Sequence, residues 1–191
     1  AGKNPPMAVT AVIPSRFAST RFPGKPLALI NGLPMIQHVH ARCLEAGCFA
    51  RVVVATDDER IEAAAKAFGA EVLRTAATHP SGTDRVAEVA RTLGLGAKEI
   101  VVNVQGDEPA LHPSSLRTLT RLFDDATVEL ATLVRTLAED ERSRPTVVKA
   151  VLDEQWRALY FSRADLPFER ESLPTPIRRW AHVGLYGYRV E

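Results

Sequence analysis

The sequence has few cysteines and no long apolar run. Cys43 and Cys48 are the only two cysteines among 191 residues, and they do not form a CxxC pair. Neither a disulfide framework nor a cysteine-ligated zinc site is therefore expected, and the default compartment is a reducing one, the cytoplasm. No segment approaches the roughly 20 consecutive apolar residues that span a bilayer, and no signal-peptide pattern opens the chain. We expect no membrane partner.

The chain also lacks a marked excess of either charge. It carries 24 lysines and arginines against 23 aspartates and glutamates, for a formal net charge of +1. A general nucleic-acid binder carries a much larger basic excess, so no nucleic-acid partner is expected. With 46% apolar and 25% charged residues, the composition is that of a globular domain, and the length suffices for one substantial core.

Two common nucleotide-binding fingerprints are also absent. A Walker A loop ending at residues 24–25 would require a glycine at Ser19 and a serine or threonine at Pro26. The Gly-Leu-Gly of residues 94–96 lacks the third glycine of the dinucleotide fingerprint and precedes an apolar run instead of following one. The sequence therefore predicts neither a kinase-type P-loop nor a Rossmann-type dinucleotide cofactor.

Short apolar runs alternate with amphipathic helical patterns. Buried parallel strands are expected at residues 8–13, 51–55, 71–74, 100–104 and 129–134, and helices at 34–46, 56–69, 83–93 and 113–124. Thr56 and Glu59 have the spacing of a capping box for the second helix. The alternation predicts an α/β fold, a doubly wound three-layer (α/β/α) domain whose ligand cleft lies along the carboxyl ends of the strands.

The pattern changes after residue 145. Two β-like runs, 147–152 and 156–161, flank a polar turn and predict an antiparallel hairpin, and residues 182–190 predict a strand that returns to the sheet. We interpret residues 1–191 as one domain, with an α/β core at 7–145 and a β-hairpin excursion with the returning strand at 146–191.

A loop after the first predicted strand concentrates positive charge. Arg16, Arg21 and Lys25 lie within ten residues, in a segment that also contains several prolines. Three cations so close together repel one another unless an anion lies among them, and Gly24 allows the backbone to approach that anion. The loop leaves the carboxyl end of a strand, so it is predicted to bind a triphosphate; a solvated basic loop is the alternative.

A second group of polar residues follows the strand predicted at residues 100–104. Gln105 and Asp107 flank Gly106, which is expected to leave room for a ligand. Mg²⁺ that arrives with a nucleoside triphosphate takes one or two carboxylate ligands beside the phosphates. Asp107 is therefore predicted to be the metal ligand, with Mg²⁺ as the cofactor; a turn or helix cap is the alternative role for this aspartate.

Residues 81–83, Ser-Gly-Thr, precede the helix predicted at 83–93. Their hydroxyls and backbone amides could face a base edge or a phosphate, because helix N-termini attract anions. The same residue types also form a plain helix start, so both interpretations stay open.

Six ordered segments resemble the 3-deoxy-manno-octulosonate cytidylyltransferase (CMP-KDO synthetase) family. They are residues 14–26 (PSRFASTRFPGKP), 55–58 (ATDD), 79–85 (HPSGTDR), 103–109 (NVQGDEP), 158–164 (ALYFSRA) and 182–188 (HVGLYGY). The resemblance implies a nucleotidyltransferase domain of the nucleotide-diphospho-sugar transferase type. Such an enzyme joins CTP to the sugar acid KDO, releases pyrophosphate, and serves lipopolysaccharide biosynthesis as a cytoplasmic homodimer.

The charge arguments and the resemblance together define a candidate site. Its catalytic residues are Arg16, Lys25 and Asp107; its nucleotide-binding residues are Arg16, Arg21, Lys25, Ser81, Gly82, Thr83 and Gln105; and, by resemblance, its sugar-acid-binding residues are Arg163, His182 and Tyr186. The family continues for several dozen residues past the last segment and has there a further Glu-Gln pair and a second metal-binding aspartate. The expectation is that either the chain or its site is incomplete at the C-terminus.

Two other functions share these features. A cytidylyltransferase for another sugar acid, of the sialic acid type, would keep the CTP residues and differ at the sugar-acid residues. A CTP-binding module without turnover would bind the nucleotide and release no pyrophosphate. A substrate panel distinguishes the three.

Overall fold

The structure, a computed structural model, describes residues 8–18, 22–168, 170 and 177–191. The chain forms two compact units. The first unit contains the chain up to Ala131 together with Leu185–Glu191, and the second unit is Thr132–Gly184. The second unit thus begins earlier than the change of pattern after residue 145, and the chain returns from it within the last strand.

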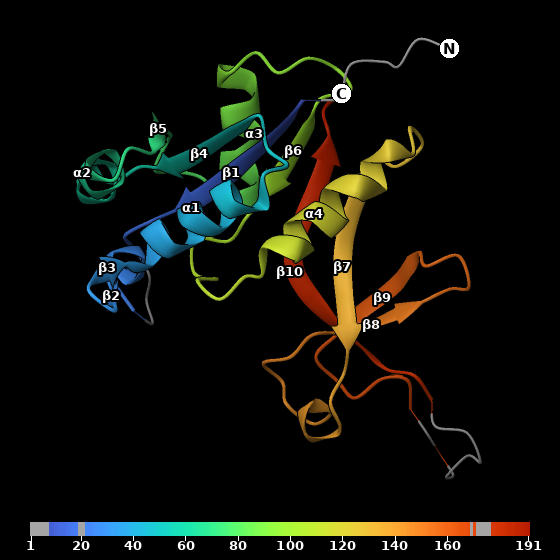
Figure 1. Cartoon of the computed structure of the whole chain (residues 1–191). Coiled ribbons are helices and arrows are strands. Elements are labelled where there is room, and N and C mark those ends of the chain that lie inside the picture. Colours follow the sequence, from blue (N-terminus) through green and yellow to red (C-terminus); the bar gives the residue numbers. More distant parts are fainter. Residues whose placement is uncertain (1–7, 19–21, 169, 171–176) are drawn as a thin grey trace. The chain divides into compact units, whose positions relative to one another are not determined.

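Four parallel strands form most of the sheet of the first unit. They are β1 (Val9–Ser15), β4 (Arg51–Thr56), β5 (Glu71–Arg74) and β6 (Ile100–Asn103), in the order β5-β4-β1-β6 (Figure 1). Each begins within one residue of its predicted start. Residues 186–189 of β10 (Trp180–Arg189) pair antiparallel with β6, which confirms the predicted returning strand.

Helices cover both faces of this sheet. The helices are α1 (Met35–Ala46), α2 (Glu59–Ala67), α3 (Gly82–Thr92) and α4 (Pro113–Arg121), the last continued by the 3₁₀ turn η2 (Leu122–Asp124). Helices α1 and α4 contact each other on one face, and α3 packs on β1 and β6 from the other (Figure 1). The predicted doubly wound three-layer architecture is confirmed. Within the described residues, no helix has both the length and the apolar character needed to cross a membrane.

The core between α3 and the sheet combines alternating strand residues with residues of the helix. Its buried members are Val12, Val53, Ala55, Val86, Val89 and Val101. Side chains alternate between the two faces of a strand, so the buried residues Ile13 and Val54 face the opposite layer. This two-sided burial explains why the strands appear in the sequence as continuous β-branched runs.

Helix α2 begins differently from the prediction. Strand β4 extends through Thr56, and the N-cap is Asp58, whose carboxylate accepts a hydrogen bond from the Arg60 backbone N–H at 2.9 Å. The Thr56 hydroxyl instead accepts from the backbone N–H of Asp58 at 3.2 Å. The predicted capping box of Thr56 and Glu59 is therefore wrong, because Thr56 is the last residue of β4 and lies two residues before the N-cap.

Short elements follow β1. They are the 3₁₀ turn η1 (Lys25–Leu27) and the two-stranded ribbon of β2 (Leu29–Ile30) and β3 (Leu33–Pro34). The turn η1 contacts α1 and α2, so the segment after the basic loop is packed against the core of the first unit.

The second unit contains the predicted hairpin. Strands β8 (Lys149–Leu152) and β9 (Ala158–Ser162) pair antiparallel, and β8 also pairs with Trp180 and Ala181 of β10. The 3₁₀ turn η3 (Glu139–Glu141) precedes the hairpin.

Strand β7 (Leu130–Thr136) pairs with β10. Glu129 accepts a backbone hydrogen bond from Arg189, and Leu137 donates one to Arg179, so the two strands run in opposite directions. The expectation of a buried parallel strand at residues 129–134 is therefore wrong. An apolar β-branched run predicts a strand but does not identify its partner.

Candidate functional site

A cavity of about 110 Å³ lies at the carboxyl ends of β1 and β6 in the first unit. Its lining residues come from the end of β1, from the loop after β6, and from the start of α3: Pro14, Ser15, Arg16, His79, Ser81, Gly82, Arg85 and Gln105. From β1 the chain passes to β4 and β5 on one side, and it then crosses to β6 on the other side of β1. The boundary between β1 and β6 is therefore a topological switch point. Open α/β sheets bind ligands at such points.

The N-terminus of α3 forms one wall of this cavity. Ser81 is the N-cap, and its hydroxyl accepts from the backbone N–H of Asp84 at 3.3 Å. Ser81 and Gly82 line the cavity, whereas Thr83 is not among its lining residues. The structure confirms the helix start, and the ligand-binding role of this segment stays a prediction, for which the first-turn amides and partial positive charge of α3 remain available.

Arg85 is a cavity residue that the sequence analysis did not select. Its side chain is only 4% exposed, donates to the Thr75 hydroxyl and lies 3.3 Å from the Asp57 carboxylate. An arginine in the first turn of an amphipathic helix has the pattern of a surface charge, so the sequence does not predict its burial. The available signal was its spacing, because residue i+3 from Gly82 shares that helix face.

His79 secures the approach to α3. Its ring is hydrogen-bonded to the Glu88 carboxylate, which also accepts from the backbone N–H of Ala76 at 3.0 Å. The His79 ring is the main reason that the pKa of Glu88 lies below its usual value. These hydrogen bonds attach residues 76–79, which precede α3, to Glu88 of the helix, and so they stabilise this wall of the cavity.

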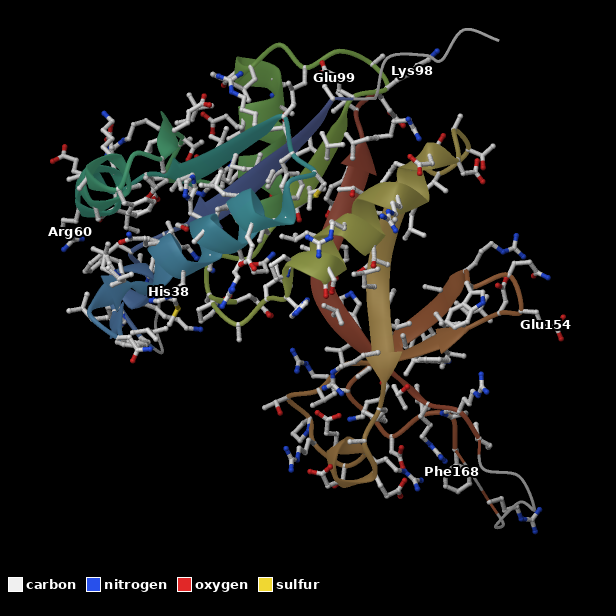
Figure 2. The ribbon with its side chains drawn as sticks, viewed as in Figure 1. His38, Arg60, Lys98, Glu99, Glu154 and Phe168 are labelled. Atoms are coloured by element: carbon white, nitrogen blue, oxygen red, sulfur yellow. The ribbon has the colours of Figure 1, made fainter. Side chains whose placement is uncertain are left out.

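The basic loop is held by an aromatic contact. Gly24 has φ 71°, a left-handed conformation that favours glycine, and a Cβ there would lie 2.8 Å from Cε2 of Phe17. The Arg60 guanidinium lies over the Phe17 ring, 3.3 Å from its centroid, and Figure 2 shows Arg60 on the surface of α2. Arg16 lines the cavity and is exposed. The predicted residue Arg21 lies outside the described residues.

Lys25 and Asp107 meet across the edge of the sheet. The Lys25 Nζ atom lies 2.6 Å from Asp107 Oδ2, although the two residues are 82 positions apart. Their side chains are 35% and 50% exposed, so the pair resembles a surface salt bridge, worth about 0–1 kcal/mol. The structure thus brings together two of the predicted catalytic residues in a contact that a bound anion or cation could open at little cost.

Gly106 has a different role from the expected one. A Cβ on this residue would lie 2.5 Å from Ser15 Oγ and 3.0 Å from the Pro14 carbonyl oxygen. The space beside Gly106 is therefore filled by the end of β1, and the expectation that it leaves room for a ligand is wrong. The glycine instead permits the loop after β6 to pack directly against β1, which places Asp107 near Lys25.

The Asp107 carboxylate fits a metal that is bound together with a nucleotide. Among the described residues, no group of three or more His, Cys, Asp or Glu side chains could hold a metal ion. Asp107 offers one half-exposed carboxylate at the edge of the sheet. Mg²⁺ commonly takes one or two protein carboxylates and completes its shell with phosphates and water, so this donor set suits Mg²⁺ held jointly with a triphosphate.

Two of the predicted sugar-acid residues belong to the second unit. Lys149 of β8 pairs with Ser162 of β9 and with Ala181 of β10, so Arg163 and His182 come one residue later on the two strands that flank β8. Their backbones are therefore about two strand spacings, roughly 10 Å, apart. Arg163 is exposed and donates from Nη1 to the Pro145 carbonyl oxygen at 2.6 Å.

His182 is half-buried against other groups of the second unit. Its Nε2 atom shares a hydrogen bond of 2.9 Å with the Thr132 hydroxyl, and its ring lies edge-on to Phe161, with 4.9 Å between centroids. Burial lowers the pKa of His182 below its usual value. The neutral imidazole is therefore the dominant form at neutral pH, and it serves as a hydrogen-bonding group.

Tyr186 belongs to the first unit. It lies opposite Asn103 in the pairing of β10 with β6, and the Asn103 side chain accepts from Gln105 Nε2 at 3.2 Å. Burial raises the pKa of Tyr186, so its hydroxyl stays protonated. The structure therefore brings Tyr186 to the same sheet edge as Gln105 and Asp107.

The fold and the cavity define the class of protein, an α/β nucleotide-binding domain of the nucleotidyltransferase type. Residues 10–191 match the family described as Cytidylyltransferase. The chain is 57% identical to the 3-deoxy-manno-octulosonate cytidylyltransferase of Myxococcus xanthus (strain DK1622), over 95% of this chain and 72% of that protein. It is 47% identical to the enzyme of the same name from Aliivibrio fischeri (strain MJ11), over 96% of this chain and 76% of that one.

A solved structure agrees with these matches. CMP:2-keto-3-deoxy-manno-octonic acid synthetase complexed with CTP aligns with a TM-score of 0.88 and 43% identity, over 95% of this chain and 74% of that one. The chain belongs to the cytidylyltransferase family, in agreement with the six segments of the sequence analysis. It spans 72–76% of the length of the curated relatives named here.

Proposed function

We propose that this protein transfers the cytidylyl group of CTP to KDO, giving CMP-KDO and pyrophosphate for lipopolysaccharide biosynthesis. The observation that carries the proposal is the convergence at one sheet edge of a small cavity, the basic loop and the Lys25–Asp107 contact. The relatives, 57% and 47% identical, carry the name of this activity.

The first unit supplies the residues for CTP. Arg16 and Lys25 would hold the triphosphate, and Gln105 with the start of α3, residues 81–83, would bind the cytosine and ribose. Arg85 adds a buried positive charge to the same cavity. Buried hydrogen-bonding groups reject a base that leaves them unpaired, which would exclude uracil and purines.

The proposed reaction is an in-line displacement at phosphorus. The anomeric hydroxyl of the sugar acid attacks the α-phosphorus of CTP and gives its proton to water, a new P–O bond forms, and the bond to pyrophosphate breaks. Asp107 would hold Mg²⁺, which when bound supplies charge neutralisation and lowers the pKa of the attacking hydroxyl. Lys25, now paired with Asp107, would turn to the phosphates, so the chain's main contribution is positioning and the neutralisation of negative charge.

Replacing Lys25 with alanine is expected to weaken CTP binding by about 1.5–3 kcal/mol, the value of one charge-assisted hydrogen bond. Calorimetric titration with CTP measures the loss. Lys66→Ala is the matched control, because Lys66 is 63% exposed on α2 and forms an ion pair with Glu62 of the same helix, away from the cavity. An unchanged CTP affinity in Lys25→Ala would contradict the triphosphate assignment and favour the alternative of a solvated basic loop.

Replacing Arg163 with lysine is expected to raise the Michaelis constant for KDO about tenfold or more, because an ammonium cannot reproduce the planar two-point contact of a guanidinium with a carboxylate. CTP affinity, measured separately by calorimetry, should stay the same, since Arg163 belongs to the second unit and the CTP residues to the first. Equal weakening for both ligands would assign Arg163 to the fold or to the phosphates instead.

A pyrophosphate-release assay with CTP, Mg²⁺ and KDO tests the function as a whole. Release that requires KDO and CTP, and that UTP does not support, is the expected result. Release with sialic acid in place of KDO would identify an enzyme for a different sugar acid. CTP binding without release with either acid would identify a nucleotide-binding module.

We also propose that the protein acts as a homodimer in the cytoplasm. The second unit exposes large apolar side chains, with Trp156, Leu159 and Tyr160 at least 60% exposed and Phe168, labelled in Figure 2, 82% exposed. Exposed apolar surface of this kind marks an interaction site. A monomer in sedimentation velocity at micromolar concentration would contradict the dimer.

Both cysteines are free, as is usual in a reducing compartment.

A further inference from the structure

Lys149 is a lysine with no exposed surface at the start of β8. Its Nζ atom donates to the Arg144 carbonyl oxygen at 2.8 Å and to the Arg163 carbonyl oxygen at 3.3 Å. All three residues belong to the second unit. A buried ammonium therefore connects the turn that precedes β8 with the residue that follows β9.

Burying a lysine is costly. An ammonium taken out of water loses several kcal/mol of hydration, and two carbonyl oxygens recover only part of it. An apolar side chain of similar length would fill the same space without that penalty. Overall stability therefore does not explain a lysine at this position. The feature that an apolar residue would lose is the pair of hydrogen bonds from Nζ.

Those contacts converge on Arg163. Lys149 holds the Arg163 carbonyl oxygen, while the Arg163 guanidinium donates to Pro145, the residue next to the other Lys149 acceptor. Lys149 therefore bridges the Arg163 carbonyl oxygen and the turn at 144–145, and the Arg163 guanidinium donates to that same turn. Lys149 Nζ thus holds the Arg163 backbone directly, and it also holds the turn that accepts the hydrogen bond of the Arg163 guanidinium.

A neighbouring ion cluster holds the chain just beyond Arg163. Arg142 donates to the Asp165 carboxylate from Nη2 at 2.9 Å and from Nε at 3.1 Å, and Arg179 lies 3.7 Å from the same carboxylate. The Arg142 hydrogen bond is the main cause of the lowered pKa of Asp165, and the charges of Arg179 and Lys149 add to it. Arg163 is therefore fixed on one side by Lys149 and on the other by this cluster.

We propose that Lys149 is a positioning residue that holds Arg163 in place to receive the carboxylate of the sugar acid. The proposal rests on the proposed function, because it takes Arg163 as the residue that binds this carboxylate. It adds a specific task for a buried lysine that touches neither substrate. A guanidinium must present its two N–H groups in a fixed plane to form a two-point contact, so a small displacement of its backbone is enough to weaken binding.

The test is Lys149→Met, which keeps the length and packing of the side chain and removes the donor. We expect the thermal midpoint to change little, because the loss of the buried charge offsets the loss of the two hydrogen bonds to carbonyl oxygens. Backbone amides of residues 163–166 should exchange hydrogen about tenfold faster, and the Michaelis constant for KDO should rise about tenfold, with CTP affinity unchanged. Lys66→Met is the matched control, since it removes an exposed lysine in the first unit.

Several outcomes would overturn the proposal. An unchanged exchange rate at residues 163–166 would mean that Lys149 does not hold Arg163. A fall in the thermal midpoint with parallel losses for KDO and CTP would mean that it serves stability alone. Lys149→Gln is the second variant, because it is neutral and retains an N–H donor; failure of both variants to fold would likewise assign Lys149 to stability and overturn the proposal.

The two readouts separate this proposal from the proposed function. Hydrogen exchange needs no substrate, so it tests the link between Lys149 and Arg163 even in a chain that shows no turnover. Faster exchange in Lys149→Met, with no KDO-dependent pyrophosphate release by the unaltered chain, would support the positioning contact and contradict the proposed function. Normal release with an unchanged Michaelis constant in Lys149→Met would support the function and overturn the positioning role.

Discussion

Replacing Asp107 with asparagine is expected to abolish metal-dependent turnover, with a loss on the order of a thousandfold in kcat, equivalent to about 4 kcal/mol. The change removes the one carboxylate charge that we assign to Mg²⁺ and keeps the size of the side chain. Stability should change by less than about 1 kcal/mol, because the contact with Lys25 is a half-exposed ion pair. Pyrophosphate release gives the rate, and urea denaturation gives the free energy of unfolding.

Two further measurements make the Asp107 result specific. Titration with Mn²⁺ in the presence of CTP, followed by electron paramagnetic resonance, should show weakened metal binding in the variant. The neighbouring Glu108 is also exposed, so Glu108→Gln serves as the matched control and should retain most of the activity. Activity near that of the unaltered chain in Asp107→Asn would remove the metal assignment.

The second large effect is expected from Gly106→Ala. The added Cβ would lie 2.5 Å from Ser15 Oγ and 3.0 Å from the Pro14 carbonyl oxygen, so the loop after β6 must move away from the end of β1. We expect a loss of about 1–3 kcal/mol in the free energy of unfolding, as for other overpacked sites. CTP affinity should also fall, because both segments line the cavity.

A second substitution tests the cause of that effect. Ser15 Oγ is buried and has no hydrogen-bond partner, so Ser15→Ala alone should be close to neutral in the free energy of unfolding. In the double variant it removes the closer of the two clashes and should recover part of the Gly106→Ala loss. Gly184→Ala is the matched control, since a Cβ there meets nothing within 4 Å. No recovery in the double variant would place the strain at the Pro14 backbone instead.

Much of this fold was readable from the sequence, because its signals are local. The β-branched runs of β1, β4, β5 and β6 and the amphipathic helices between them have the alternation of a doubly wound sheet, and each strand began within one residue of its prediction. Parallel strands bring their carboxyl ends to one edge. That rule placed Lys25 and Asp107 near each other before any contact was known, and the 2.6 Å ion pair confirms it.

The sequence by itself therefore determined the order of strands and helices along the chain, the sheet edge where the candidate site lies, and the family. Only the tertiary structure decided which neighbours each side chain meets, because those contacts join residues far apart in the chain. It buried Arg85 in the cavity wall, filled the space beside Gly106 with the end of β1, and paired β7 with β10. It also enclosed Lys149 between two carbonyl groups, a placement that no periodicity records, because burial of a charge depends on the partners that folding brings to it.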